Sequence, residues 1–301
     1  MSELASEPST QAVGLVPTEP QEQVEAAGTA PRRRGWGPIF WVCVAWLAVV
    51  IVLALFGGAL GLADYGAKVG PPRAAPSTDS LSTLLGTDSV GRSVLSRIAA
   101  GGRVSLVVGL VATAIGLTIG VLLGMLAAYF RGWVEAVIAV LTDSVLAFPP
   151  LILLLAVAAV VKPSLTTLIL SLGGLVIPGF VRLMKANALQ VLGREYITAA
   201  HAIGASTGRV LFRDVLPNAF FPLLSYSLLV VATMMVAEGS LSFLGLGIPP
   251  PYPSWGGMVS AGRGDIADAP LTVLAPAVVL FLTVFSLNTL GDRLRKRFAL
   301  R

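Results

Sequence analysis

Few residues of this 301-residue chain have the chemistry of a catalytic or metal-binding group. The chain has one Cys, Cys43, and one His, His201, which excludes an intrachain disulfide and leaves too few ligands for a zinc cluster. Residues 204–208 match the G-x-S-x-G pattern of a hydrolase nucleophile around Ser206. That pattern needs a strand-to-helix turn and a base later in the chain, whereas His201 precedes it. We therefore expect neither a metal site nor an enzymatic role.

Phosphate binding and ion coupling also lack their usual residues. No Gly stands directly before any Lys, so the chain has no G-x-x-x-x-G-K-[ST] loop and is not expected to hydrolyse ATP. Asp143 and Glu238 lie in or beside long apolar segments, where carboxylates can mark an ion-coupled carrier. Such a carrier normally has several of these groups and binding sites near the membrane midplane. Interfacial positions for both side chains are therefore the favoured interpretation, with ion coupling as the alternative.

The elements that must position these residues are apolar segments long enough to cross a membrane. Apolar residues make up 55% of the chain and charged residues 12%, against about a quarter charged in soluble proteins. With a mean hydropathy of +0.83, we expect an all-α polytopic membrane protein with six transmembrane helices. The apolar runs are 39–63, 104–129, 136–161, 165–183, 219–237 and 271–290. Prolines 149, 150 and 178 predict kinks in the third and fourth runs.

The distribution of charge orients these spans. In a six-span topology, 14 of the 21 Lys and Arg residues fall on the side of the N-terminus and seven on the other side. This bias predicts a multi-pass protein with both termini in the cytoplasm, and it accounts for the net charge of +5 without nucleic acid as a partner. Residues 1–35 hold five Glu, no Lys and no aromatic residue, which predicts a disordered cytoplasmic tail.

A stripe of glycines marks the second span. Gly116, Gly120 and Gly124 repeat at four-residue spacing on one helical face. Small residues at this spacing let a second helix approach to backbone contact. We expect tight packing within the bundle, and a face that lines a pore or meets another subunit is the alternative.

The polar segment 184–218, expected as a cytoplasmic loop with one or two short helices, resembles a known motif. It is similar to the E-A-A-x-x-x-G-x(9)-I-x-L-P loop of binding-protein-dependent ABC importer permeases. The residues in register are Thr198, Ala199, Ala200, Gly204, Leu216 and Pro217. Thr198 stands where the family has Glu, and Asp214 where it has Ile or, in the peptide branch, His.

This resemblance implies that the segment couples the membrane helices to a cytoplasmic ATPase subunit. The residues implied to dock the ATPase are Glu195, Ala199, Ala200, Gly204, Leu216 and Pro217. Glu195 is included because it can replace the ionic contact of the family's first Glu. Pro217 is expected to end the segment and to redirect the chain into the fifth span.

Three further segments resemble the DppC/OppC-like permeases of the peptide and nickel branch. They are 85–97 (L-G-T-D-S-V-G-R-S-V-L-S-R, with Ser93 replacing Asp), 238–256 (E-G-S-L-S-F-L-G-L-G-I-P-P-P-Y-P-S-W-G) and 288–292 (N-T-L-G-D). The resemblance implies external loops at 64–103 and 241–270, the latter closing the pore or supporting a docked binding protein. Its implied gate residues are Leu241, Phe243, Leu244 and Trp255. An ordinary interfacial anchor is the alternative role of this loop.

The resemblance covers about residues 36–298, leaving 299–301 as a short C-terminal end, and implies a type I ABC importer permease fold. The implied function is import of peptides across the bacterial plasma membrane, with nickel or glutathione as alternative cargo. The implied partners are a second, homologous permease, two ATP-binding subunits and an external substrate-binding protein. ATP and Mg would be bound by those partners, and this chain would need membrane lipid but no cofactor of its own. An ion-coupled secondary carrier and a membrane scaffold are the competing classes.

Overall fold

The computed structural model describes residues 37–298, so the expected tail 1–35 and the C-terminal end 299–301 lie outside the described residues. Within 37–298 the chain is helical, and strand pairing is limited to two isolated bridges. The helices long and apolar enough to cross a membrane are α1 (Pro38–Phe56), α2 (Val94–Phe130), α5 (Leu165–Leu192), α8 (Leu216–Phe243) and α10 (Leu271–Phe298). A broken pair, α3 (Gly132–Leu146) and α4 (Pro150–Val160), supplies a sixth candidate span. The predicted all-α membrane architecture is confirmed.

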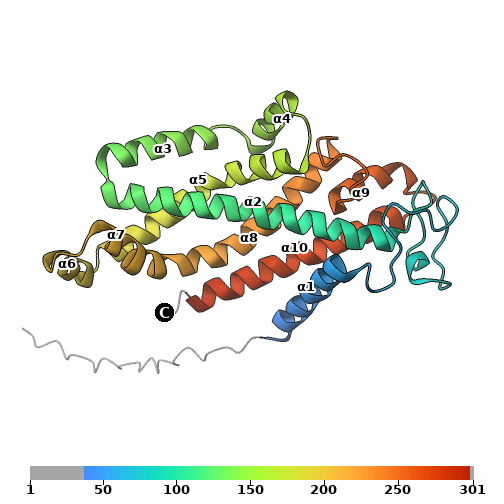
Figure 1. Cartoon of the computed structure of the whole chain (residues 1–301), viewed down its shortest axis with the longest axis horizontal. Helices are drawn as coiled ribbons and strands as arrows, with labels where there is room; N and C mark the ends of the chain where they lie inside the picture. The colour runs from blue at the N-terminus through green and yellow to red at the C-terminus, as the bar shows by residue number, and fades with distance from the viewer. Residues whose placement is uncertain (1–36, 299–301) are drawn as a thin grey trace, which may run out of the picture. The chain divides into compact units, whose positions relative to one another are not determined.

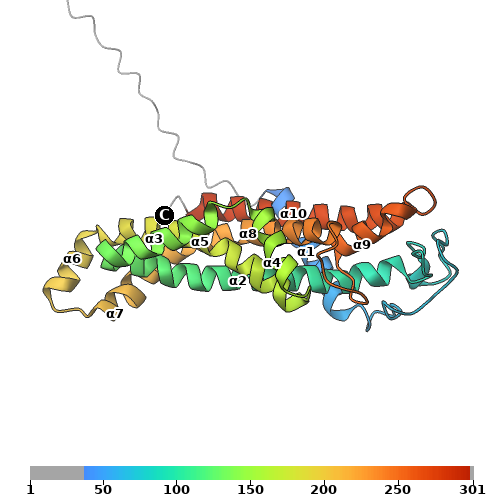
Figure 2. The ribbon, with the colours of Figure 1, turned by 90° about the horizontal axis from the view of Figure 1, so that it is seen from above.

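Short helices mark the two ends of the bundle. We call one the α6 end, after α6 (Glu195–Ala202), which is followed by α7 (Thr207–Arg209); the other is the α9 end, after α9 (Trp255–Gly262). α2, α5 and α10 run toward the α6 end, whereas α8 runs toward the α9 end (Figure 1). α6 extends beyond the ends of α2 and α3 both in the view of Figure 1 and when seen from above in Figure 2. The segment between α5 and α8 is therefore accessible at the α6 end.

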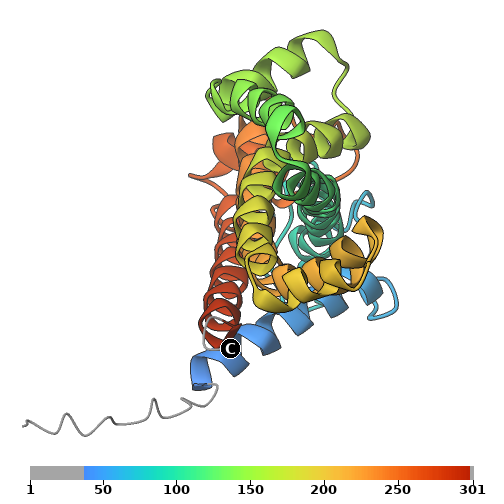
Figure 3. The ribbon, with the colours of Figure 1, turned by 90° about the vertical axis from the view of Figure 1, so that its left-hand side faces the viewer.

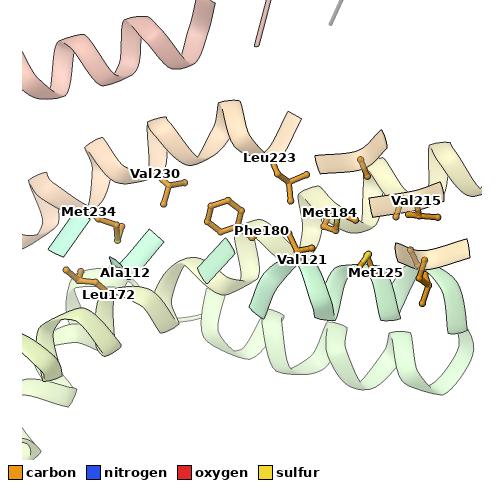
Figure 4. Packing of buried hydrophobic residues seen from close by; sticks show 14 of the residues in the cluster. Ala112, Val121, Met125, Leu172, Phe180, Met184, Val215, Leu223, Val230 and Met234 are labelled. Atoms are coloured by element: carbon orange, nitrogen blue, oxygen red, sulfur yellow. The ribbon is translucent and has the colours of Figure 1, made fainter. Parts of the chain in front are cut away.

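The core lies where α2, α5 and α8 pack together. Phe180 of α5, which is fully buried, points toward Leu223 and Val230 of α8 (Figure 4). Met184 lies beside it, across from Val121 of α2 (Figure 4). Three apolar helix faces are thereby buried against one another, and lipid is excluded from this core.

The three spaced glycines of α2 all face α5. An added Cβ on Gly124 would lie 2.7 Å from Cβ of Met184 and 2.8 Å from the carbonyl oxygen of Val181. Cβ atoms on Gly116 and Gly120 would collide with side chains of α5. The two backbones approach closely because these positions have no side chain.

The same contacts show that α2 and α5 are parallel. Gly116 lies against Gly173, and Gly124 lies against Met184, so residue numbers rise together along both helices. Two parallel neighbours require the chain between them to return along the bundle. The α3–α4 pair provides that return, with α3 running antiparallel to α2 from its end (Figure 1).

α1 and the α3–α4 pair lie at opposite edges of the bundle, with α2 and α5 between them (Figure 3). The expected single kinked span at 136–161 is two helices bent by 85° at the break before Pro150. Pro150 takes the first position of α4, where its missing N–H leaves no backbone hydrogen bond unmade. Many apolar side chains of this pair are exposed in this chain, among them Val140, Leu141 and Ile152.

Several helix bounds differ from the sequence-based ones. α1 ends at Phe56, before Gly57, Gly58 and Gly61, because glycines are poor helix formers. α2 begins at Val94, so the last ten residues expected in the loop 64–103 are helical. α5 continues to Leu192 and α8 to Phe243, into segments expected as loops. In each case polar residues interrupt the apolar run, and Arg103 of α2, Lys185 of α5 and Glu238 of α8 have hydrogen-bond or ion-pair partners there, so the apolar pattern ends before the helix does.

Candidate functional site

At the α6 end, one continuous helix joins the short α7 to the long α8. It runs from Thr207 to Phe243 through a π-helical turn, Val210–Val215. Pro217 lies in the first turn of α8 and does not redirect the chain, contrary to the sequence-based expectation. The wider π turn just before it accommodates a residue that has no backbone N–H to donate. α7, the π turn and α8 therefore form one continuous helical element.

Gly204 ends α6 in a left-handed turn. Its φ is +83°, a conformation that disfavours side chains. The amide of Gly204 donates to the carbonyl of His201, and the amide of Ala205 donates to that of Ala200, both at 3.0 Å. This is the Schellman pattern, which satisfies carbonyls at a helix end. A Cβ at Gly204 would meet no atom of this chain within 4 Å, so the space beside it is open.

Tyr129, near the end of α2, holds the turn between α6 and α7. Its hydroxyl lies 3.0 Å from the hydroxyl of Thr207 and 3.4 Å from Nε2 of His201. Ile197, which is only 2% exposed, attaches α6 to the hydrophobic core. Ser206 is exposed and caps no helix with its side chain.

The residues implied to dock an ATPase are brought together in this segment with different exposure. Glu195, Ala199, Gly204 and Pro217 are exposed, whereas Ala200 and Leu216 are half-buried. Large apolar side chains that the sequence analysis did not single out are also exposed here: Ile203 at 80%, Phe212 at 57% and Tyr196 at 44%. The α6 end therefore presents small and apolar residues to its surroundings, as a protein-docking surface does.

At the α9 end, Glu238 lies in a closed polar socket. It is fully buried among side chains of this chain. Its Oε1 accepts hydrogen bonds from the hydroxyls of Ser254 at 2.7 Å and Ser242 at 2.8 Å, and its Oε2 from Ser105 at 3.3 Å. The three serines come from α2, α8 and the start of α9, so the carboxylate ties these elements together. Hydroxyl donors make its burial tolerable.

Trp255 completes this attachment of α9. The residue is 1% exposed, its Nε1 donates to the carbonyl of Ile98 at 2.9 Å, and its amide donates to the Ser105 hydroxyl at 3.1 Å. Among the implied gate residues, Leu241 is also buried and lies within α8. Phe243 and Leu244 are each 52% exposed. The structure thus divides the four into two anchors and two accessible side chains.

The segment before α2 is held by an ion-pair cluster around Asp88. The carboxylate accepts from the amides of Val90 and Arg92, pairs with the Arg92 side chain at 2.7 Å and lies 3.5 Å from Nε of Arg97. Burial raises the pKa of Asp88, but the hydrogen bonds from Arg92 and Val90 outweigh it and hold the pKa below its usual value. The motif 85–97 is therefore a compact, self-bonded cap on α2.

A cavity of about 650 Å³ opens beside this cap, between α1 and α2. Arg103 lines it but is engaged, since its guanidinium donates to the carbonyls of Ala54 and Leu55 near the end of α1. The Ser96 hydroxyl, also in the lining, has no hydrogen-bond partner among the described residues. The remaining lining is largely apolar and offers few groups to a charged ligand.

Asp143 lies in α3 and is paired with a residue of α5. α3 starts at Gly132 rather than near Ala136, which places Asp143 about 16 Å along the helix. It pairs with Arg182 of α5 at 2.6 Å, and Glu135 pairs with Lys185 at the same distance. Sequence reasoning did not find these pairs, because their partners lie on helices that are distant in the chain.

Comparison with known proteins matches this chain to membrane components of transport systems. Residues 120–301 match the family described as binding-protein-dependent transport system inner membrane component. The chain is 37% identical over 211 residues to the glutathione transport system permease protein GsiD of Pectobacterium atrosepticum, covering 70% of each chain. It is 36% identical over 247 residues to the dipeptide transport system permease protein DppC of Alkalihalophilus pseudofirmus, covering 81% of this chain and 80% of the relative.

A solved structure of the MetNI methionine ABC transporter, in an inward facing conformation, has a similar fold. The TM-score is 0.56 at 19% identity, over 67% of this chain and 96% of that chain. At this identity the likeness concerns the fold alone.

Proposed function

We propose that this chain, which belongs to the family of binding-protein-dependent transport system inner membrane components, is a permease subunit of an ABC importer that moves peptides across the plasma membrane. Relatives named for dipeptide and glutathione transport support a peptide cargo. Glutathione itself, or nickel through the same machinery, is the alternative cargo.

The observation that carries the proposal is the single helix from Thr207 to Phe243. Its exposed start, with α6, offers a docking surface, and its other end lies beside the buried Glu238 socket. An ATPase that moved α6 and α7 would tilt α8 as a rigid lever and change access at the α9 end. This chain would contribute no covalent chemistry, since ATP and Mg belong to the partners.

The proposed complex contains a second, homologous permease, two ATP-binding subunits and an external substrate-binding protein. The α6 end would face the cytoplasm, together with both termini, and the α9 end would face the binding protein. An ion-coupled carrier is less favoured, because Glu238 and Asp143 are both engaged within the chain and leave no free carboxylate at these positions.

The test is transport by the complex in proteoliposomes. We expect the chain to co-purify with a related permease and two ATPases, and a labelled dipeptide to accumulate only with ATP and the loaded binding protein. Nickel and glutathione serve as the parallel cargoes. Uptake by the isolated chain on an ion gradient, ATP hydrolysis by the isolated chain, or no ATP-dependent flux of any of the three would contradict the proposal.

A further inference from the structure

Two arginines share one carboxylate in the cap on α2, residues 85–97. Asp88 pairs with the Arg92 side chain at 2.7 Å and lies 3.5 Å from Nε of Arg97. Among residues 37–298, Asp88 is the only acid that pairs with either arginine. One positive charge of this group is therefore left without a counter-charge.

The arginine farther from the carboxylate, Arg97, is also the more deeply buried one. The residue is 9% exposed, whereas the Arg92 side chain is 23% exposed and reaches solvent. The Nη1 atom of Arg97 is buried and has no hydrogen-bond partner among the described residues. A buried cationic N–H without an acceptor is costly, because it has given up its hydration and gained nothing in return. Arg97 therefore needs an acceptor that the described chain does not supply.

A small cavity adjoins these side chains. Its volume is about 40 Å³, and its lining comes from the cap, from α9 and from the start of α10. Asp88, Arg92 and Arg97 line it together with Asp265, which Arg73 already holds at 2.7 Å. A space of this size admits a water molecule or an ion of similar size, but no larger ligand.

We infer that this cavity binds a small monovalent anion such as chloride. Arg97 and Arg92 supply the positive charge, and Arg97 has an N–H group free to donate. Three guanidinium groups, those of Arg73, Arg92 and Arg97, stand against the carboxylates of Asp88 and Asp265, so one anion balances the group. A water molecule would accept from the N–H but would leave the buried charge uncompensated. The bound ion would join the cap on α2 to α9, and this inference does not depend on the proposed function.

The test compares the melting temperature of the full-length protein in sodium chloride and in sodium gluconate. Gluconate is too large for the cavity, and equal ionic strength keeps the screening of other charges the same. An ion that binds only the folded state stabilises it, so we expect melting about 3 °C higher in chloride when its concentration is about tenfold above the dissociation constant. Equal melting in the two salts would mean that water fills the cavity, and would overturn the inference.

Arg97→Gln removes the buried cation and leaves Asp88 paired with Arg92, so it creates no lone charge. We expect the difference in melting between the two salts to vanish in this variant. Arg103→Gln is the matched control, because Arg103 lies on the same helix but donates to two backbone carbonyls near the end of α1. It should keep the chloride response of the parent. A response retained by Arg97→Gln, or lost equally in Arg103→Gln, would place the effect outside this site and overturn the inference.

A carboxylate placed beside Arg97 should replace the bound ion. Ser93 lies one helical turn before Arg97, and its carbonyl accepts from the Arg97 amide at 3.1 Å. Ser93→Asp keeps a residue that caps the helix and brings a carboxylate next to the guanidinium, so we expect the chloride response to disappear. Because the Ser93 hydroxyl also donates to the Ser82 carbonyl, only the difference between the two salts is compared for each variant.

Ser164→Asp is the matched control for this carboxylate. Ser164 caps α5 as Ser93 caps α2, with its side chain accepting from the amide three residues on, but Leu168 stands where α2 has Arg97. This control should respond to chloride like the parent. A full chloride response in Ser93→Asp would show that the carboxylate and the ion do not compete for Arg97, and would overturn the inference.

Discussion

Gly204 combines a conformational requirement with an open neighbourhood. Its positive φ closes the Schellman turn, and no atom of this chain lies near the missing Cβ. The substitution Gly204→Leu should cost about 1–2 kcal/mol through the left-handed conformation. It should also place a bulky side chain on the proposed docking surface, so we expect membrane insertion to persist while ATPase co-purification or coupled import falls.

Two matched variants separate these causes. Gly204→Asn tolerates the left-handed conformation better and should be the milder change. Ser206→Ala should leave import unchanged, because the exposed hydroxyl caps nothing. Reconstituted import and ATPase rates are the measurements; normal import by Gly204→Leu, or abolished import by Ser206→Ala, would show that the coupling site lies elsewhere.

Glu238 accepts hydrogen bonds from the hydroxyl groups of three serines. Replacing it with Leu would leave the buried hydroxyls of Ser105, Ser242 and Ser254 without this acceptor. We expect Glu238→Leu to lower stability by about 1–3 kcal/mol, whereas Glu238→Gln keeps an acceptor oxygen and should cost less. Thermal melting in detergent, with the exposed Glu195→Gln as control, measures this. Equal melting of Glu238→Leu and the parent would be incompatible with the socket.

At the scale of elements, the sequence was informative about which helices exist and less so about where they end. Apolar runs located the five long helices and the broken pair α3–α4, since lipid imposes its own length on segments that cross it. The early start of α2 was missed because Arg97 and Arg103 break the apolar run. Their partners, Asp88 and the carbonyls at the end of α1, come from other segments, and hydropathy carries no information about such contacts.

The candidate coupling site was predictable because its motif is local in sequence. The spacing from Ala199 to Pro217 located the segment, but not the clamp from Tyr129 or the continuity of α7 with α8. Glu238 was noticed as a carboxylate beside a span, yet its donors Ser105 and Ser254 lie on other elements. Contacts between helices distant in the chain are what a single sequence leaves unspecified.

The parallel packing of α2 and α5 yields a prediction about helix association. A Cβ added at Gly124 would lie within 2.8 Å of atoms of Val181 and Met184, whereas one added at Gly174, on α5, would have no neighbour within 4 Å. Gly124→Leu should therefore force the two helices apart at a cost of about 1–3 kcal/mol or more. Gly174→Leu adds the same side chain in open space and should be tolerated.

Melting temperature and the yield of folded protein in detergent measure the difference between these two variants. If Gly124→Leu were as stable as Gly174→Leu, the helices would not pack through the glycine face. The outcome would also weaken the argument that α2 and α5 are parallel neighbours, since that register rests on these contacts.

For the whole molecule, the direction of each helix decides on which side of the membrane its two ends lie. α2 and α5 are parallel, so the α3–α4 pair must return the chain along the bundle between them. If the α3–α4 pair crosses the membrane, the chain has six spans and both termini lie on the same side. If the pair is re-entrant, the chain has five spans and the termini lie on opposite sides. The parallel register of Gly116 with Gly173 and Gly124 with Met184 favours six.

The distribution of basic residues also favours six spans, and it predicts that both termini lie in the cytoplasm. Arg32 to Arg34 precede α1, and Arg295, Lys296 and Arg297 occupy the last turn of α10, so basic residues flank both ends of the helical region. We expect a reporter fused after Arg301 to be active in the cytoplasm, and one inserted at the exposed Asp79, before α2, to report from outside. An external signal from the Arg301 fusion would mean that α3 and α4 do not cross. The lever from α7 to α8 would then have no ATPase on its side of the membrane, and the proposed coupling would fail with the topology.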